Sequence, residues 1–141
     1  TMPTSPAASV KTLEGLRDVR LGAQVGTTSY EAAKKVAGDQ EVLVYNTNDD
    51  AKAALAAGQI DVLVLDLPTT FAVQSELPGS VIIGQLPPQP GADEQFGIVL
   101  DKGSPLTACV SKAVDELGDD GALFRMQKEW LAGPGAAPFL T

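Results

Sequence analysis

The sequence of 141 residues contains no histidine and a single cysteine, Cys109. Without histidine, the Ser-His and Cys-His pairs of hydrolytic enzymes are excluded. A zinc or iron site is disfavoured as well, because such sites mostly use histidine and cysteine ligands. A lone cysteine cannot form an internal disulfide, so the cysteine content leaves the redox compartment open. We therefore expect no metal and no other cofactor.

Clusters of basic residues and long apolar runs are missing too. Ten Lys and Arg residues are scattered among 18 Asp and Glu residues, which gives a net charge of −8. The basic footprint of a nucleic-acid-binding protein is therefore absent, as is a polybasic membrane patch. No apolar run is long enough to span a bilayer. With 44% hydrophobic and 20% charged residues, the composition is that of an ordinary globular domain with a sizeable core.

Short apolar runs alternate with helical patterns along the chain. Five runs are predicted to be strands: Val19–Gln24, Glu41–Tyr45, Ile60–Asp66, Ser80–Gly84 and Phe96–Leu100. The third run is nearly continuous in apolar, β-branched residues, which is typical of a parallel strand covered on both faces. Five helices are predicted to begin at the capping box Thr28–Glu31, at Asn48, near Pro68, at Ser104 and near Asp120. This order predicts an α/β fold with a mostly parallel five-stranded sheet and helices on both faces.

One candidate site follows the first predicted strand, in the segment from Gln24 to Ser29. Gly26 allows a sharp turn there, and the next helix begins with free backbone N–H groups at its positive end. A carboxylate fits such a helix start, and the hydroxyls of Thr27 and Thr28 add donors. The alternative is a capped helix start without any ligand.

A second candidate site is Asp66, at the end of the third predicted strand. Its carboxylate could receive an ammonium group, or it could only cap the helix that begins near Pro68. Strands one and three are neighbours in many doubly wound sheets, so the two sites are expected side by side. An anion site next to a cation site matches a zwitterion such as an α-amino acid.

Three stretches resemble a known family, in order and with its spacing: VKTLEGLRDVRLGAQVGTTSYEAAKK, VYNTNDDAKAALAAGQIDVLVLDLPTTFAV and EQFGIVLDKGSPLTACVSKAVDELGDDGALFRMQKEWL. The chain resembles the polar amino-acid-binding proteins of ABC importers (extracellular solute-binding family 3), which have the type II periplasmic-binding fold. In that family two lobes close on the ligand outside the cytoplasm, and the closed form docks on a membrane permease.

The resemblance implies a role for each candidate residue. Thr28, with Thr27 beside it, corresponds to the threonine that holds the ligand carboxylate. Asp66 corresponds to the aspartate that holds the ammonium group, and Gln24 to a position that often faces the ligand. The implied organisation is a linker at 1–10, lobe two at 11–93, the hinge return strand and C-terminal helices of lobe one at 94–132, and a tail at 133–141.

The chain departs from the family because a full member carries a long additional N-terminal stretch with most of lobe one. We therefore expect a truncated or processed piece whose ligand binding by itself is weak or absent. Helices 104–118 and 121–132 carry apolar stripes, which are expected to be covered by folding back on lobe two or by forming a homodimer. Three alternatives stay open: a cyclohexadienyl-dehydratase-like enzyme, a sensing module of a receptor or regulator, and a binder of another solute such as a sulfonate.

Overall fold

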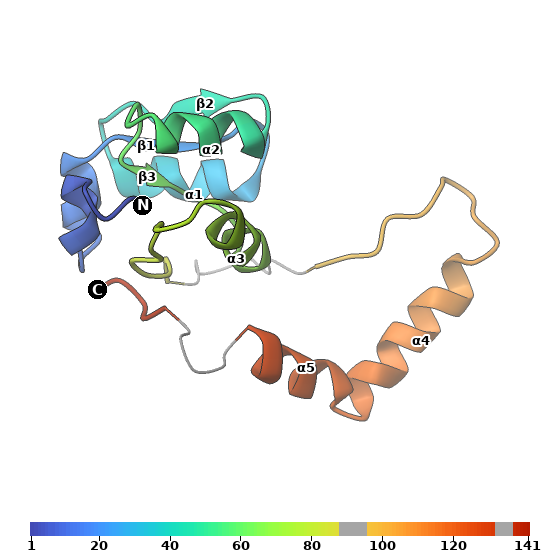
Figure 1. Ribbon diagram of the computed structural model, residues 1–141. Coiled ribbons are helices and arrows are strands. Elements are labelled where there is room, and N and C mark those ends of the chain that lie inside the picture. Colours follow the sequence, from blue (N-terminus) through green and yellow to red (C-terminus); the bar gives the residue numbers. More distant parts are fainter. Residues whose placement is uncertain (88–95, 132–136) are drawn as a thin grey trace. The chain divides into compact units, whose positions relative to one another are not determined.

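The computed structural model describes residues 1–87, 96–131 and 137–141 (Figure 1). These residues form two compact units. Unit 1 contains Thr1–Pro87 and Ala137–Thr141, and unit 2 contains Pro88–Ala136. Among the described residues, no helix is both long enough and apolar enough to cross a membrane.

Unit 1 is built on a parallel sheet. Its strands are β1 (Leu21–Gln24), β2 (Leu43–Tyr45) and β3 (Val62–Leu63), in the order β2-β1-β3. Its helices are α1 (Thr28–Ala37), α2 (Asn48–Ala56) and α3 (Leu67–Glu76), and two short 3-10 helices span Pro6–Ser9 and Glu14–Asp18. Strands and helices alternate along the chain, so the predicted α/β class and the parallel direction of the strands are confirmed.

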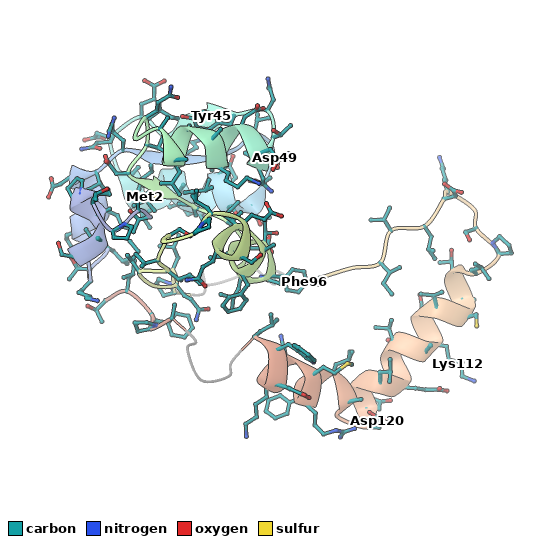
Figure 2. All side chains as sticks on the ribbon, viewed as in Figure 1. Met2, Tyr45, Asp49, Phe96, Lys112 and Asp120 are labelled. Atoms are coloured by element: carbon teal, nitrogen blue, oxygen red, sulfur yellow. The ribbon has the colours of Figure 1, made fainter. Side chains whose placement is uncertain are left out.

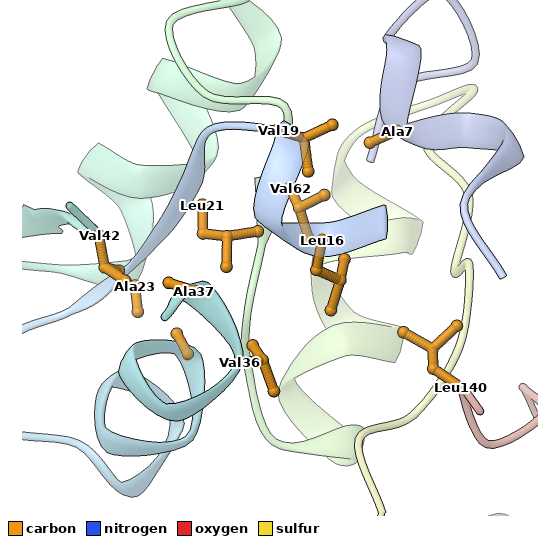
Figure 3. Packing of buried hydrophobic residues seen from close by; sticks show 11 residues of the cluster. Ala7, Leu16, Val19, Leu21, Ala23, Val36, Ala37, Val42, Val62 and Leu140 are labelled. Atoms are coloured by element: carbon orange, nitrogen blue, oxygen red, sulfur yellow. The ribbon is translucent and has the colours of Figure 1, made fainter. Parts of the chain in front are cut away.

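Helices cover both faces of the sheet. Successive side chains of β1 point to opposite sides, so the strand contributes to the apolar packing on each face. Leu21 and Ala23 face α1, where they join the buried cluster that also contains Val36 (Figure 3). Gly22 faces the other side, where Ile60 belongs to a second cluster with residues of α2. A Cβ atom at Gly22 would lie only 2.6 Å from Cδ1 of Ile60, so the close packing there requires glycine.

The prediction of five strands is wrong for the described residues, which contain a three-stranded sheet. The segment Ser80–Gly84 joins no strand of that sheet. The segment Phe96–Leu100 is irregular, and Phe96 and Val99 are 73% and 95% exposed. An apolar, β-branched run becomes a strand only where a neighbouring strand pairs with its backbone, and no described segment pairs with this one.

Two helices begin with a cap one residue earlier than predicted. Thr27, not Thr28, caps α1 by accepting the Tyr30 N–H at 3.1 Å. Thr47, not Asn48, caps α2 in the same way by accepting the Asp50 N–H at 3.1 Å. In both places two neighbouring residues can serve as a cap, and the residue whose oxygen meets the free N–H group takes the role.

Both ends of the described chain pack on unit 1. Residues 1–10, expected to be a linker, contain the fully buried Ala7, and in the expected tail Leu140 is only 5% exposed. Residues 94–95 and 132–136 lie outside the described residues. The assignment of 11–93 to lobe two and of 94–132 to lobe one stays a prediction.

The described residues of unit 2 form two helices, α4 (Thr107–Asp119) and α5 (Ala122–Trp130), which contact each other. Gly121 joins them with a φ of 74°, a left-handed conformation that favours glycine. Neither helix has a buried residue. Figure 2 shows the side chains that they carry, with Lys112 of α4 and Asp120, the residue after α4, labelled.

Candidate functional site

The two candidate loops leave the sheet at the same edge. β1 and β3 are parallel neighbours, with Gly22 opposite Leu63, and the Val64 N–H extends the pairing by donating to Gly22 O at 2.9 Å. Since the carboxyl ends of parallel neighbours meet at one edge, the segments that follow Gln24 and Val64 emerge side by side. The predicted neighbourhood of strands one and three is confirmed.

The first loop separates the roles of its two threonines. The Thr27 hydroxyl donates to Gln24 O at 2.8 Å and accepts the Tyr30 N–H, so it holds the turn that follows β1. Thr28 is exposed, and its hydroxyl makes no hydrogen bond within the part of the chain that the structure describes. Gln24 is half-buried at the end of the strand.

Two backbone donors accompany the Thr28 hydroxyl. Thr28 and Ser29 are the first two residues of α1, and their N–H groups find no acceptor among the described residues. The positive end of the helix dipole lies at the same place. This helix start therefore offers a hydroxyl and two N–H groups to a negatively charged group.

Asp66 presents the opposite polarity on the second loop. It caps α3, because Oδ1 accepts the Thr69 N–H at 3.0 Å and Oδ2 accepts the Thr69 hydroxyl at 2.7 Å. A carboxylate has about four lone-pair sites, so two bonds leave acceptor capacity free. Asp66 is also exposed. Asp66 therefore does cap α3, as the alternative interpretation predicted, and its remaining lone pairs are free to accept a hydrogen bond from a cation.

Thr69 was missed by sequence reasoning, although the spacing Asp66-x-x-Thr69 is visible in the chain. It resembles a capping box in which the residue at the third helical position bonds back to the cap. Here threonine takes the place of the usual glutamate or glutamine. Because threonine is not the residue expected at this position, the sequence pattern was not identified as a capping box.

The far end of α3 is tied to α2 by Lys52. Its ammonium group contacts Asp49 at 2.8 Å and Glu76, the last residue of α3. The hydrogen bonds that Lys52 donates to these carboxylates, the one to Asp49 first, raise the pKa of Lys52 above its ordinary value. α3 is thereby held at its start by the Asp66 cap and at its end by an ion pair.

A second ion pair lies at the opposite edge of the sheet, where the strands begin. Asp61 is buried, and its two carboxylate oxygens accept from Nη2 and Nε of Arg20 at 2.9 Å each. The side-chain hydrogen bond from Arg20 is the main cause that lowers the pKa of Asp61. This pair joins the segments before β1 and β3, and it is therefore part of the scaffold rather than of the candidate site.

Comparisons with known proteins show which proteins the chain is similar to. No family model matches the chain. The ABC transporter glutamine-binding protein GlnH of Bacillus subtilis is 27% identical over 126 residues, which cover 88% of this chain and 45% of GlnH. The solved structure of ArtJ, an arginine-, lysine-, histidine-binding protein of Geobacillus stearothermophilus, matches with 26% identity and a TM-score of 0.62. Over most of its length the chain is thus similar to amino-acid-binding proteins, one of them from an ABC transporter.

The chain spans about half the length of the relatives it matches. The match to ArtJ covers 94% of the chain and 57% of ArtJ. An ancestral amino acid-binding protein, described as a precursor of cyclohexadienyl dehydratase, is also similar, with 26% identity and a TM-score of 0.59. That match covers 89% of this chain and 53% of the ancestor.

Proposed function

We propose that this chain is part of an extracytoplasmic solute-binding protein that captures an amino acid for an ABC importer. The observation that carries the proposal is the opposite polarity of Thr28 and Asp66 at one edge of the sheet. It is supported by the similarity to GlnH and ArtJ, whose names describe amino-acid binding.

In this proposal the two loops bind the two charged ends of one ligand. The ligand carboxylate accepts from the Thr28 hydroxyl and from the free N–H groups at the start of α1. The ligand ammonium donates to the free lone pairs of Asp66 in a charge-assisted hydrogen bond. Gln24 faces the ligand from the end of β1, and Thr27 holds the turn that presents Thr28.

Thr69 supports the binding role of Asp66 by holding its carboxylate. The N–H and hydroxyl of Thr69 bond to different oxygens of Asp66, so they restrict rotation of that side chain. A group that is already oriented loses less freedom when the ligand binds. The neighbouring Thr70 hydroxyl bonds instead to the Asp66 backbone carbonyl at 2.9 Å, which makes Thr70 a matched control.

For the whole protein we propose capture by closure of two lobes. The ligand contacts both lobes and shifts an open–closed equilibrium toward the closed form, which then docks on the membrane permease. No covalent bond is made or broken, so the protein acts as a binding protein rather than an enzyme. A ligand in contact with one lobe alone loses half of these contacts, and this chain alone therefore binds weakly.

The test is an NMR titration of the isotope-labelled chain with glutamine and with arginine. We expect saturable shift changes centred on the amides of Thr28 and Asp66. Asp66→Asn and Thr28→Val are expected to weaken binding by more than about 1 kcal/mol, or roughly fivefold. Thr69→Val is expected to weaken binding less, and Thr70→Val not at all.

Asp115→Asn, which removes the same charge from the exposed surface of α4, is the control for Asp66→Asn. If Asp66→Asn binds as tightly as the unchanged chain, Asp66 is not part of the site. A complete lack of saturable binding by the unchanged chain would count against amino-acid capture at this edge.

A dehydratase is the second candidate function, and one observation favours it. The ancestral protein described as a precursor of cyclohexadienyl dehydratase has a similar fold. Without histidine, a general acid in this chain would have to be an aspartate or a glutamate. The test is a turnover assay with a cyclohexadienyl acid. If the chain converts this acid and Asp66→Asn does not, the function is catalysis rather than binding.

We also propose that the exposed apolar side chains of unit 2 favour a homodimer of this chain. Phe124 and Trp130 on α5 are 69% and 72% exposed, and Leu106 before α4 is 57% exposed. Large exposed apolar patches are typical of interaction sites. Sedimentation velocity from micromolar to millimolar concentration tests this proposal, and a monomer mass throughout would contradict it.

A further inference from the structure

The segment Ala137–Thr141 is bonded to unit 1 on two sides. On one side Gln85 and Phe139 form a parallel bridge, in which the Gln85 N–H donates to Pro138 O at 2.8 Å and the Leu140 N–H donates to Gln85 O at 2.9 Å. On the other side the Leu13 N–H donates to Thr141 O at 2.9 Å. The segment is thus bonded to two parts of the chain that are distant in sequence.

The apolar contact between this segment and unit 1 is made mainly by the side chain of Leu140. Leu140 is 5% exposed and joins the buried cluster that contains Leu16 (Figure 3). Next to it, a Cβ atom at Gly84 would lie 2.5 Å from Cδ2 of Leu140 and 3.0 Å from Pro138 O, so glycine is needed there. Phe139, in contrast, is 57% exposed.

None of these hydrogen bonds involves β1, β2 or β3. The partners of the segment are residues 11–13 and Gln85, which lie outside the three strands. The segment is held by two buried side chains, Ala137 and Leu140, by a few backbone hydrogen bonds, and by the Gln85 side chain, whose Nε2 donates to Ala137 O at 2.7 Å. Segments held by so few contacts open at a lower free energy than the core of a domain. Loss of these contacts would leave the hydrogen bonds between the three strands in place.

We infer that Ala137–Thr141 is a strap that seats and unseats as one cooperative unit. When it is seated, unit 2 is attached to unit 1 at both of its ends, through Pro87 and through Ala137. When it is unseated, the covalent connection after Pro87 is the remaining attachment of unit 2 to unit 1. The seating and unseating of the strap require no ligand, so this inference is independent of the proposed function.

Amide hydrogen exchange of the full chain tests the strap. Leu140→Asp places a charge in the apolar contact and is expected to accelerate exchange of the Leu140 and Gln85 amides by more than about tenfold. The Val64 amide, which donates to Gly22 O inside the sheet, is expected to change by less than about twofold. Phe139→Asp is the control, because it adds the same charge to an exposed position of the same segment.

A second variant reaches the strap from the other side. Gly84→Ala places a methyl group against Leu140 and is expected to give the same pattern of faster exchange without adding a charge. If the Val64 amide accelerates together with Leu140 and Gln85 in both variants, the segment does not open separately. Unchanged exchange at Leu140 in Gly84→Ala, or equal effects of Phe139→Asp and Leu140→Asp, would likewise overturn the inference.

Discussion

Both units contain helices with apolar stripes, but among the described helices only α1 and α2 of unit 1 have buried residues. In α1, Ala33 and Val36 are buried against the sheet. In unit 2, α4 and α5 have no buried residue, and Leu123 and Met126 stay exposed. The pattern of a helix therefore identifies the face that can be buried, whereas burial itself depends on an opposing layer.

The largest expected effect on the free energy of unfolding comes from truncating a buried leucine of unit 1, compared with an exposed leucine of unit 2. Leu21 is 1% exposed in the core of unit 1, so Leu21→Ala is expected to lower the free energy of unfolding by about 2–5 kcal/mol. Leu106→Ala, at a 57% exposed position of unit 2, is expected to change it by less than about 0.5 kcal/mol. Urea unfolding followed by circular dichroism measures both variants, and equal losses would contradict the comparison.

An intermediate effect is expected from ion pairs. Asp61→Ala removes the buried partner of Arg20 in unit 1 and is expected to cost about 1.5–3 kcal/mol at neutral pH. In unit 2, Glu116 is 3.7 Å from Lys112 with both side chains largely exposed, so Glu116→Ala is the control with little effect.

The pH dependence of unfolding sharpens this test. Because the pKa of Asp61 is lowered in the folded state, its stabilisation is complete above the unfolded value of about 3.9 and is lost as pH falls through the folded value. Asp61→Ala is therefore expected to lose stability less steeply than the unchanged chain below about pH 4. Parallel acid profiles of the two proteins would show that the pair does not stabilise the fold.

The smallest expected effect compares two glycines. Gly22→Ala pushes a methyl group against Ile60 and Tyr45 and is expected to cost about 1–3 kcal/mol. At Gly97, in unit 2, nothing lies within 4 Å of an added Cβ atom, so Gly97→Ala is expected to be neutral or slightly stabilising. Thermal unfolding of both variants distinguishes a packed position from an open one.

Local signals in the sequence predicted the helices and the order of the first three strands, whereas they did not predict which segments after β3 find a pairing partner. The α/β order, the parallel strands and the start of α3 near Pro68 followed from spacing and caps. The predicted strand at Phe96–Leu100 failed because its apolar residues say nothing about a partner backbone. The bridge between Gln85 and Phe139 was missed for the same reason, since its two residues are far apart in the chain.

The candidate site was predictable to the level of its loops. The sequence placed Thr28 and Asp66 after neighbouring strands, which the sheet order confirms, and their ligand-binding roles stay a prediction. It did not distinguish the cap Thr27 from its neighbour Thr28, because both side chains are chemically able to cap a helix. The contact of Thr69 with Asp66 depends on a side-chain rotamer, which composition and periodicity do not specify.

The direction of the bridge between Gln85 and Phe139 limits how this protein can be shortened. Parallel segments cannot be joined by a two-residue hairpin and need a crossover of about a dozen residues or more, and unit 2 provides that crossover here. A deletion variant that joins Pro87 directly to Ala137 would therefore lose the Leu140 contact. A replacement linker of crossover length would allow the C-terminal residues to return to Gln85.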